Sequence, residues 1–374
     1  MRLKSIRYEE YRNDPRHWVL NTCELDKINL VVGKNSTGKS RLIHVISSIA
    51  SLLSGKRPNI FESGHWDIEL EAPQTKIQYS LSIEEGKVEH ESIIFNDRKM
   101  MYRDNEGEGE IWYEEEKRFI KFRTPEDKIA ATQKKDDLQH PFFTPLYIWA
   151  DRVELHSFGT DFGRSEAITT EQLGRIMEND LDIPDRKTPT VTYIKGYQKF
   201  KEEFDKAVID DMQKLGYSLT DVGCRPIETG VSALPTQLFG LFLREDGCES
   251  WISQVSMSQG QFRALALTIY INYLAFTKTE KFLLIDDVGE GLDYERSLGM
   301  IDVLMEKCQK GSSQIIMTSN DKFVMNKVPL SFWTILRRDK NIVTGYTERN
   351  SREKFENFQF MGLNNFDLFS SDII

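Results

Sequence analysis

The chain has 374 residues, with 59 acidic and 49 basic side chains, a net charge of −10 and a pI of about 5.3. This length suits one large domain or two of ordinary size, and the acidic balance argues against coating nucleic acid by charge alone, although it leaves room for a local basic groove. The four cysteines form no CxxC pair, which is typical of a reduced, cytoplasmic protein without a cysteine zinc site. We expect neither a signal peptide nor a membrane span, because no sufficiently long apolar stretch is present.

The N-terminal third begins with two well-marked elements. Residues 27–33 (KINLVVG) predict a buried strand, and residues 40–55 have apolar side chains at helical spacing, with Gly55 as a stop signal. Between residues 66 and 133, short β-patterned runs alternate with turn residues. This alternation predicts an antiparallel sheet inserted after the first helix.

The remaining elements are weaker until about residue 259. In chain order we expect a helix within 138–155, an irregular stretch at 156–194, one amphipathic helix at 197–215, a strand pair or loop-edged strand at 235–246, a helix at 259–276, buried strands at 281–286 and 313–319, and a helix around 294–309 between them. The Phe-rich C-terminal tail is expected to dock on the domain or on a partner.

The segment GKNSTGKS (33–40) fits the pattern G-x-x-x-x-G-K-[ST] between a strand and a helix. Gly33 and Gly38 let the backbone curl so that N–H groups and the helix N-terminus face an anion. Lys39 can then reach the terminal phosphates, and Ser40 can bind Mg²⁺. The predicted phosphate cradle comprises Gly33, Asn35, Ser36, Thr37, Gly38, Lys39 and Ser40; the alternative is a plain Gly/Ser-rich turn.

The segment LLIDDVGEGLD (283–293) is an apolar run that breaks into carboxylates. A P-loop enzyme needs a carboxylate for Mg²⁺ at the end of a neighbouring parallel strand, and Asp286 has that place. Asp287, next to it, is a candidate to orient or deprotonate the attacking water. Strands often end in Asp at a turn, which is the alternative. Glu290 is either an exposed turn residue or a substitute for a longer carboxylate at Asp287.

The segment VSMSQGQFRALAL (255–267) opens a helix with Ser258, Gly260 and Gln261. Hydroxyl and N–H groups at a helix start favour an anion. A second phosphate site in one chain needs an explanation, however, and a simple serine cap accounts for the same residues.

In this order, GKNSTGKS, MSQGQ and LLIDDVGEGLD resemble the Walker A, signature, Walker B and D-loop motifs of ABC-type ATPases. The opening MRLKSIRYEEYR resembles the RecF/SMC-like (AAA/OLD-like) branch. The resemblance is strong over 1–60 and 250–345 and loose between them. It implies an α/β P-loop NTPase fold with ABC-ATPase head architecture, in which a mixed, largely parallel core sheet carries an inserted antiparallel β subdomain and a helical lobe.

The expected divisions of this single head follow from the motifs. They are the P-loop portion of the first lobe (1–60), the antiparallel β subdomain (61–135), the helical insert and second lobe (136–250), the signature, Walker B and last core strands (251–350), and the tail (351–374).

In that family two heads sandwich ATP, with the signature of one protomer on the P-loop of the other. The resemblance therefore implies that Ser258, Gly260 and Gln261 contact the γ-phosphate in trans, which explains the second cradle and implies a homodimer or higher homo-oligomer. Asp293 would belong to the D-loop at the dimer interface.

Two further assignments follow from the resemblance alone. Gln133, with Gln139 as second choice, would touch Mg²⁺ and the water, and Arg12 would contact the nucleotide. An exposed glutamine and a plain surface arginine are the alternatives for these positions.

Two departures from the family pattern bear on turnover. Asp287 replaces the family's catalytic glutamate, and the histidine after the next strand is missing. Ser319 and Asn320 stand there instead and can hydrogen-bond a phosphate or water. ATP and Mg²⁺ binding is expected, with slow hydrolysis.

Three functions remain open at this point. Compact proteins of this kind resemble the ATPase components of bacterial anti-phage defence systems, which control a partner nuclease or toxin. A DNA repair or recombination ATPase would instead bind DNA on the dimerised heads and would need a basic stripe. In a third interpretation, ATP only clamps the dimer and hydrolysis is vestigial.

Overall fold

The P-loop strand β3 (Ile28–Val32) is buried along its whole length, as its continuous apolar run predicts for a strand covered on both faces. It lies between β16 (Gln314–Thr318) and β17 (Trp333–Asp339) and is parallel to both. The strand β15 (Phe282–Asp286) pairs in parallel with β16 on its other side. The carboxyl ends of these four strands therefore meet at one edge of the sheet.

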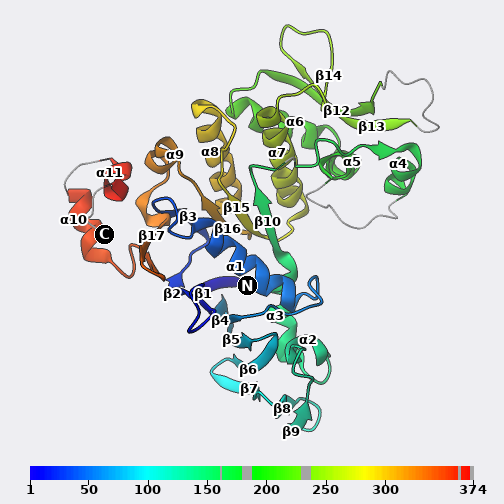
Figure 1. Ribbon diagram of the computed structural model, residues 1–374. Helices are drawn as coiled ribbons and strands as arrows, with labels where there is room; N and C mark the ends of the chain where they lie inside the picture. Colours follow the sequence, from blue (N-terminus) through cyan, green and yellow to red (C-terminus); the bar gives the residue numbers. More distant parts are fainter. Residues whose placement is uncertain (161, 179–187, 229–236, 361–363, 371–374) are drawn as a thin grey trace. The chain divides into compact units, whose positions relative to one another are not determined.

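The computed structural model describes residues 1–160, 162–178, 188–228, 237–360 and 364–370. The chain forms two compact units, drawn in Figure 1. The first unit contains residues 1–156, 281–286 and 314–374, and the second contains residues 157–280 and 287–313.

The first unit is built on a 14-stranded sheet in the order β10-β15-β16-β3-β17-β18-β2-β1-β4-β5-β6-β7-β8-β9. Its other strands are β1 (Arg2–Glu10), β2 (Trp18–Glu24), β4 (Gly64–Ala72), β5 (Thr75–Glu84), β6 (Lys87–Phe95), β7 (Arg98–Arg103), β8 (Glu108–Tyr113), β9 (Arg118–Arg123), β10 (Val153–Ser157) and β18 (Ile342–Tyr346). The antiparallel strands expected after the first helix are present, and they continue the same sheet as the P-loop strand.

The helix α1 (Lys39–Leu53) buries the apolar stripe that its sequence predicts. It contacts β15, β16 and α3, and the backbone carbonyl of Val45 accepts a hydrogen bond from the Trp66 indole of β4. Gly55 has φ +77° and ends the helical segment, as predicted. The other helices of this unit are α2 (Ala130–Gln133), η1 (Pro141–Phe143), α3 (Thr144–Arg152), α9 (Lys322–Lys327), η2 (Leu330–Phe332), α10 (Arg352–Phe360) and α11 (Asn365–Ser370).

The second unit combines helices with a small antiparallel sheet in the order β11-β13-β12, in which β14 also pairs with β13. Its elements are β11 (Ile168–Thr169), α4 (Thr170–Met177), α5 (Pro189–Phe200), α6 (Glu202–Lys214), β12 (Leu219–Pro226), β13 (Leu238–Glu245), β14 (Ile252–Ser253), α7 (Gln259–Thr277) and α8 (Tyr294–Lys310). The helices predicted at 259–276 and around 294–309 are thus confirmed, as are the strands at 281–286 and 313–319.

The expectation of one helix over 197–215 is wrong. Lys201 has φ +53°, so the chain leaves the helical conformation there and α5 and α6 are separate. The break brings the two helices together: a Cβ added to Gly196 would lie 2.5 Å from the Phe204 ring, which is fully buried. This close approach explains why glycine stands at position 196.

The expectation of an irregular stretch over 156–194 is also wrong for its described residues. It contains β11, α4 and the start of α5. The helix α4 begins with a capping box, in which the side chains of Thr169 and Gln172 each bond the other's backbone N–H. The TTEQ sequence carries that signal. Of the segment predicted at 235–246, the described residues from 237 onward contain the strand β13.

The Phe-rich tail docks on its own unit. Phe355, Phe358 and Leu368 are buried, and the Asn365 amide donates to the carbonyl of Val328 next to α9. Of the described helices, none is long and apolar enough to cross a membrane.

Candidate functional site

The phosphate-binding loop between β3 and α1 has the backbone geometry that its glycines predict. Gly38 has φ +103° and Ser36 has φ +66°, so the chain turns through left-handed conformations just before the helix. A Cβ on Gly33 would lie 2.4 Å from the Thr37 hydroxyl oxygen and 3.0 Å from the Leu336 carbonyl oxygen. Glycine is therefore required at both ends of the loop.

The side chains of the loop fix its shape from inside. The buried Lys39 ammonium donates to the carbonyl oxygens of Gly33 (2.7 Å) and Lys34 (3.4 Å). The Thr37 hydroxyl donates to the same Lys34 carbonyl at 2.8 Å. Asn35 and Ser36 are exposed on the outside of the loop. A positive charge thus sits under a cradle of backbone N–H groups at the start of α1.

Three hydroxyl and carboxylate groups converge beside the loop. Asp286 Oδ1 accepts hydrogen bonds from Ser40 Oγ (3.1 Å) and from Thr318 Oγ1 (2.6 Å). Ser40 lies in the first turn of α1, Asp286 ends β15 and Thr318 ends β16. The parallel strand order β15-β16-β3 brings these chain-distant residues to one place.

Thr318 is a site residue that the sequence patterns did not reveal. Its side chain is fully buried, and its position at the end of the strand next to Asp286 depends on strand order. The only local signal is a hydroxyl residue closing the apolar run QIIMT.

Asp287 has φ +52°, a left-handed conformation that Asp tolerates better than most residues. Its carbonyl accepts the Glu290 N–H at 3.0 Å, so the chain turns sharply directly after Asp286. Glu290 is exposed, and its carboxylate oxygen would lie 2.8 Å from a Cβ on Gly159. A left-handed backbone at a carboxylate beside a candidate metal ligand is compatible with a functional site.

Ser319 and Asn320 follow β16 directly. The buried Ser319 hydroxyl accepts the Asp321 N–H at 3.1 Å, whereas Asn320 is exposed. Asn320 therefore has the more accessible side chain of the two.

The signature segment forms the start of α7 in the second unit. Ser258 is the N-cap residue, and its hydroxyl oxygen accepts the Gln261 N–H at 3.1 Å. The Gln261 side chain donates to Glu245 at 2.7 Å. A Cβ on Gly260 would lie 2.5 Å from the Gly291 carbonyl oxygen, so this helix start packs tightly on the segment after Asp287.

Asp293 is the N-cap residue of α8, where its carboxylate accepts the Arg296 N–H at 3.0 Å. It also forms an ion pair with the Arg296 side chain. This structural role accounts for an aspartate in the GLD sequence.

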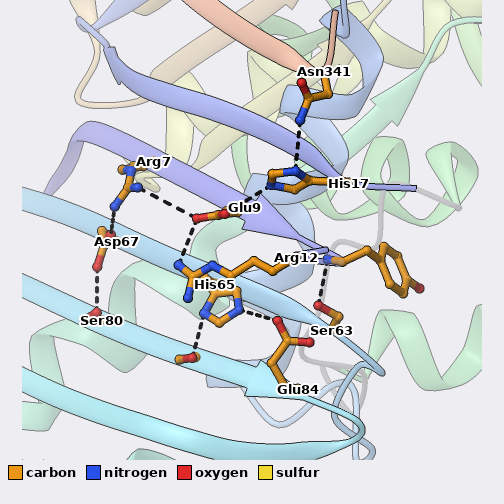
Figure 2. Close-up of polar contacts among 12 residues, drawn as sticks. Arg7, Glu9, Arg12, His17, Ser63, His65, Asp67, Ser80, Glu84 and Asn341 are labelled. Atoms are coloured by element: carbon orange, nitrogen blue, oxygen red, sulfur yellow. Dashed lines mark hydrogen bonds and ion pairs between the residues drawn. The ribbon is translucent and has the colours of Figure 1, made fainter. Parts of the chain in front are cut away.

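Arg12 lies in a polar cleft on β1, β4 and β5, shown in Figure 2. Its guanidinium donates to Glu9 at 2.8 Å, and this hydrogen bond lowers the pKa of Glu9 to about 2. The cleft is lined by Arg7, Glu9, Arg12, His65, Asp67, Ser80, Leu81 and Ser82. This lining contains no P-loop residue, and the Arg12 guanidinium forms an ion pair with Glu9.

Gln133 is the exposed last residue of α2. Among the described residues, neither Gln133 nor Gln139 donates a hydrogen bond to Asp286 or Ser40. The helix α2 is instead anchored by the buried Glu91, which accepts the N–H groups of Ala130 (2.6 Å) and Ala131 (2.8 Å). Burial raises the pKa of Glu91.

These residues fit a nucleotide phosphate chain with Mg²⁺. The loop offers N–H donors and the Lys39 ammonium, and Ser40 with Asp286 offers the two oxygen ligands that Mg²⁺ takes from a P-loop protein. Mg²⁺ would neutralise charge on the phosphates.

Comparison with protein families gives a match over residues 28–326, most of the chain, to a family described as "AAA domain, putative AbiEii toxin, Type IV TA system". The chain belongs to this AAA family. None of the curated proteins compared with the chain matches it.

Solved structures show the same fold for this AAA-family chain. The crystal structure of an SMC head bound to the C-winged helix domain of ScpA has a TM-score of 0.53 at 12% identity, and the match covers 94% of this chain and 100% of that chain. A Pyrococcus furiosus SMC head with an extended coiled coil, bound to the C-terminal domain of ScpA, has a TM-score of 0.50 at 11% identity, with 96% and 99% covered. At such identities the likeness concerns the fold alone. It confirms the predicted α/β P-loop fold with the architecture of an SMC head.

Proposed function

We propose that this chain binds and hydrolyses ATP with Mg²⁺, dimerises around the nucleotide and thereby controls a partner effector. The observation that carries the proposal is the convergence of Ser40 and Asp286 beside the P-loop, in a chain of an AAA family. A phosphate cradle alone binds anions, whereas a cradle with a carboxylate-held hydroxyl also binds the metal of a nucleoside triphosphate.

Asp287 is our candidate for the residue that orients or deprotonates the attacking water. It directly follows the metal carboxylate, and its left-handed backbone gives its side chain a different direction from that of a continuing strand. Asn320, at the end of β16, is the candidate for a hydrogen bond to the γ-phosphate or the water. Both groups are weaker catalysts than a glutamate and a histidine, so we expect slow turnover.

The start of α7 is the candidate contact for the γ-phosphate of a second protomer. Ser258 uses its oxygen as the helix cap, and its O–H remains a donor. One N–H of the Gln261 side-chain amide bonds Glu245, and the other N–H remains as a donor for a phosphate. Gly260 lets this helix start pack on the segment that follows Asp287.

A role in anti-phage defence is supported by the family description, which names a toxin of a type IV toxin–antitoxin system. The matched SMC heads were solved with ScpA bound, so this fold is compatible with a protein partner. We therefore propose a nuclease or toxin as the effector.

DNA repair by direct DNA binding is the second candidate, which the resemblance to the RecF/SMC-like branch suggests. The net charge of −10 disfavours it. Identifying the protein that co-purifies with the chain separates the two: a nuclease or toxin supports effector control, and salt-sensitive DNA binding by the isolated chain supports repair.

The Asp287→Asn variant tests the catalytic assignment. We expect kcat to fall about 100-fold or more, because general base catalysis contributes factors of that size. ATP binding, measured by calorimetry, should persist. Lys39→Ala should lose ATP binding altogether, since the ammonium both holds the loop and faces the phosphates.

Glu290→Gln is the matched control for Asp287→Asn. It removes a nearby carboxylate of the same turn and should leave kcat unchanged. If Glu290→Gln abolishes turnover and Asp287→Asn does not, Glu290 activates the water. If neither changes the rate, hydrolysis does not use this turn and ATP acts as a clamp.

A further inference from the structure

The P-loop has a second flank, on the side of β3 away from Asp286. The strand β17 runs parallel to β3 there, with Thr334 opposite Val31 and Ile335 opposite Val32. The Leu336 carbonyl lies within 3.0 Å of a Cβ placed on Gly33. The end of β17 is therefore in direct contact with the phosphate cradle, at the sheet edge where ligands of α/β proteins bind.

Arg338 and Asp339 are the two exposed residues at this end of β17. Arg338 Nη1 donates to the Ser36 carbonyl of the P-loop at 3.0 Å, and Arg338 Nε donates to the Lys340 carbonyl at 2.7 Å. Among the described residues, no carboxylate forms an ion pair with it. Two backbone carbonyls thus hold a full positive charge at the rim of the cradle, and three of its five N–H donors remain for a ligand.

A second guanidinium lies close by. Arg41 directly follows Ser40 in α1, its guanidinium carbon is 4.4 Å from the Trp18 ring centroid, and it pairs with Glu10. Burial lowers the pKa of Arg41, and the positive charge of Arg338 lowers that pKa as well. Trp18 also lies against Gly38, within 3.0 Å of a Cβ placed there. The two arginines and the tryptophan therefore surround the P-loop on one side.

Two neighbouring cations repel each other unless an anion is shared between them. Ser40 and Asp286, the residues that would hold Mg²⁺ with the terminal phosphates, lie on the β16 side of the loop. The phosphate nearest the nucleoside is the one left for the opposite, β17 side. Arginine suits this task because its planar fork matches phosphate oxygens.

We propose that Arg338, supported by Arg41, binds the α-phosphate of the nucleotide and so makes the P-loop selective for nucleotides over shorter phosphate chains. The assignment rests on the proposed function, because it takes ATP as the ligand. Arg338 is thus a second candidate arginine for the nucleotide site beside Arg12, whose guanidinium pairs with Glu9.

The test is the affinity of Arg338→Ala for ATP and for inorganic pyrophosphate, each with Mg²⁺, measured by calorimetry on the full chain. Pyrophosphate fills only two phosphate positions. We expect ATP affinity to fall about 10- to 100-fold, the usual effect of losing a charged hydrogen bond, and pyrophosphate affinity to stay within about twofold. In steady state, KM for ATP should rise while kcat at saturation is retained.

Two variants complete the design. Arg338→Lys keeps the positive charge but lacks the planar guanidinium group. It should therefore bind ATP more tightly than Arg338→Ala and more weakly than the wild type. Arg352→Ala removes an exposed arginine of α10 that pairs with Glu356, and should match the wild type.

Three results would overturn the assignment. Unchanged ATP affinity in Arg338→Ala means that Arg338 does not touch the nucleotide. An equal loss for ATP and pyrophosphate means that Arg338 only supports the loop through Ser36. A lower kcat at unchanged KM places Arg338 in the chemical step. Absence of ATP binding by the wild type would instead refute the proposed function, so the two failures are distinguishable.

Discussion

The hydrogen bond between Thr318 and Asp286 shows how one buried hydroxyl can orient the carboxylate that we propose as a Mg²⁺ ligand. Thr318 Oγ1 donates to Asp286 Oδ1 at 2.6 Å, shorter than the 3.1 Å bond from Ser40 to the same atom. A threonine at the end of β16 thus fixes the rotamer of the carboxylate from behind. Such outer hydrogen bonds commonly contribute 10- to 100-fold to metal affinity.

Replacing Thr318 with valine should raise the Mg²⁺ concentration needed for half-maximal ATP hydrolysis about tenfold or more. Valine keeps the shape of the side chain but leaves Asp286 without this donor. A Mg²⁺ titration of the ATPase rate measures the effect, and Thr318→Ser, which keeps the hydroxyl, should stay near the wild type. The same Mg²⁺ requirement in the valine variant would show that the bond has no role in metal binding.

At the scale of elements, a hydrogen bond between a tyrosine and a titratable aspartate joins α5 and α6. The Tyr193 hydroxyl of α5 donates to Asp205 of α6 at 2.9 Å. Partial burial raises the pKa of Asp205 to about 6. A carboxyl whose folded pKa exceeds its unfolded value contributes stability at low pH, and this contribution is lost as the pH rises through the folded pKa.

We therefore expect Asp205→Asn to gain stability over the wild type as the pH rises from about 4 to above 6. Asparagine still accepts the Tyr193 hydrogen bond and does not titrate. The difference in free energy of unfolding should stay below about 2 kcal/mol, because a half-exposed carboxylate is screened by solvent. Urea unfolding of both proteins at several pH values measures it. A pH-independent difference would mean that Asp205 titrates normally.

The break between α5 and α6 at Lys201 shows a limit of predicting helices from apolar spacing. The apolar residues Phe200, Phe204, Val208 and Met212 recur every four positions. This spacing predicts one continuous helix. A single residue at φ +53° divides the segment and lets Phe204 pack on Gly196. Apolar periodicity indicates which face of a helix is buried. Whether the helix continues without a break depends on tertiary packing.

At the scale of the whole molecule, the contact between Gly260 and Gly291 joins the signature helix to the segment after Asp287. Both segments belong to the proposed dimer interface. Their packing tolerates no side chain at position 260, because the neighbouring atom is a backbone carbonyl oxygen that cannot rotate away.

Gly260→Ala should abolish ATP-dependent dimerisation while each protomer still binds ATP at its own P-loop. Light scattering with and without ATP measures the dimer, and calorimetry measures binding. Gly174→Ala is the matched control, because a Cβ there meets nothing within 4 Å. A Gly260→Ala protein that dimerises normally would argue against the signature helix as the interface.

The core strands and the chemistry of the phosphate loop are readable from the sequence alone. Continuous apolar runs predicted β3, β15 and β16, and the spacing of Gly33, Gly38, Lys39 and Ser40 predicted a phosphate cradle, because these signals are local to the chain. They placed Asp286 at a strand end next to a turn.

Which side chains meet in the site depends on the order of the strands in the sheet. Strand order brings Thr318 onto Asp286 and Arg338 onto Ser36, across 32 and 302 positions of the chain. Tertiary packing also places the Phe-rich tail beside α9, where Asn365 bonds the Val328 carbonyl. Partners so far apart in sequence leave no periodic or spacing signal, since their meeting depends on how the strands are ordered in the sheet.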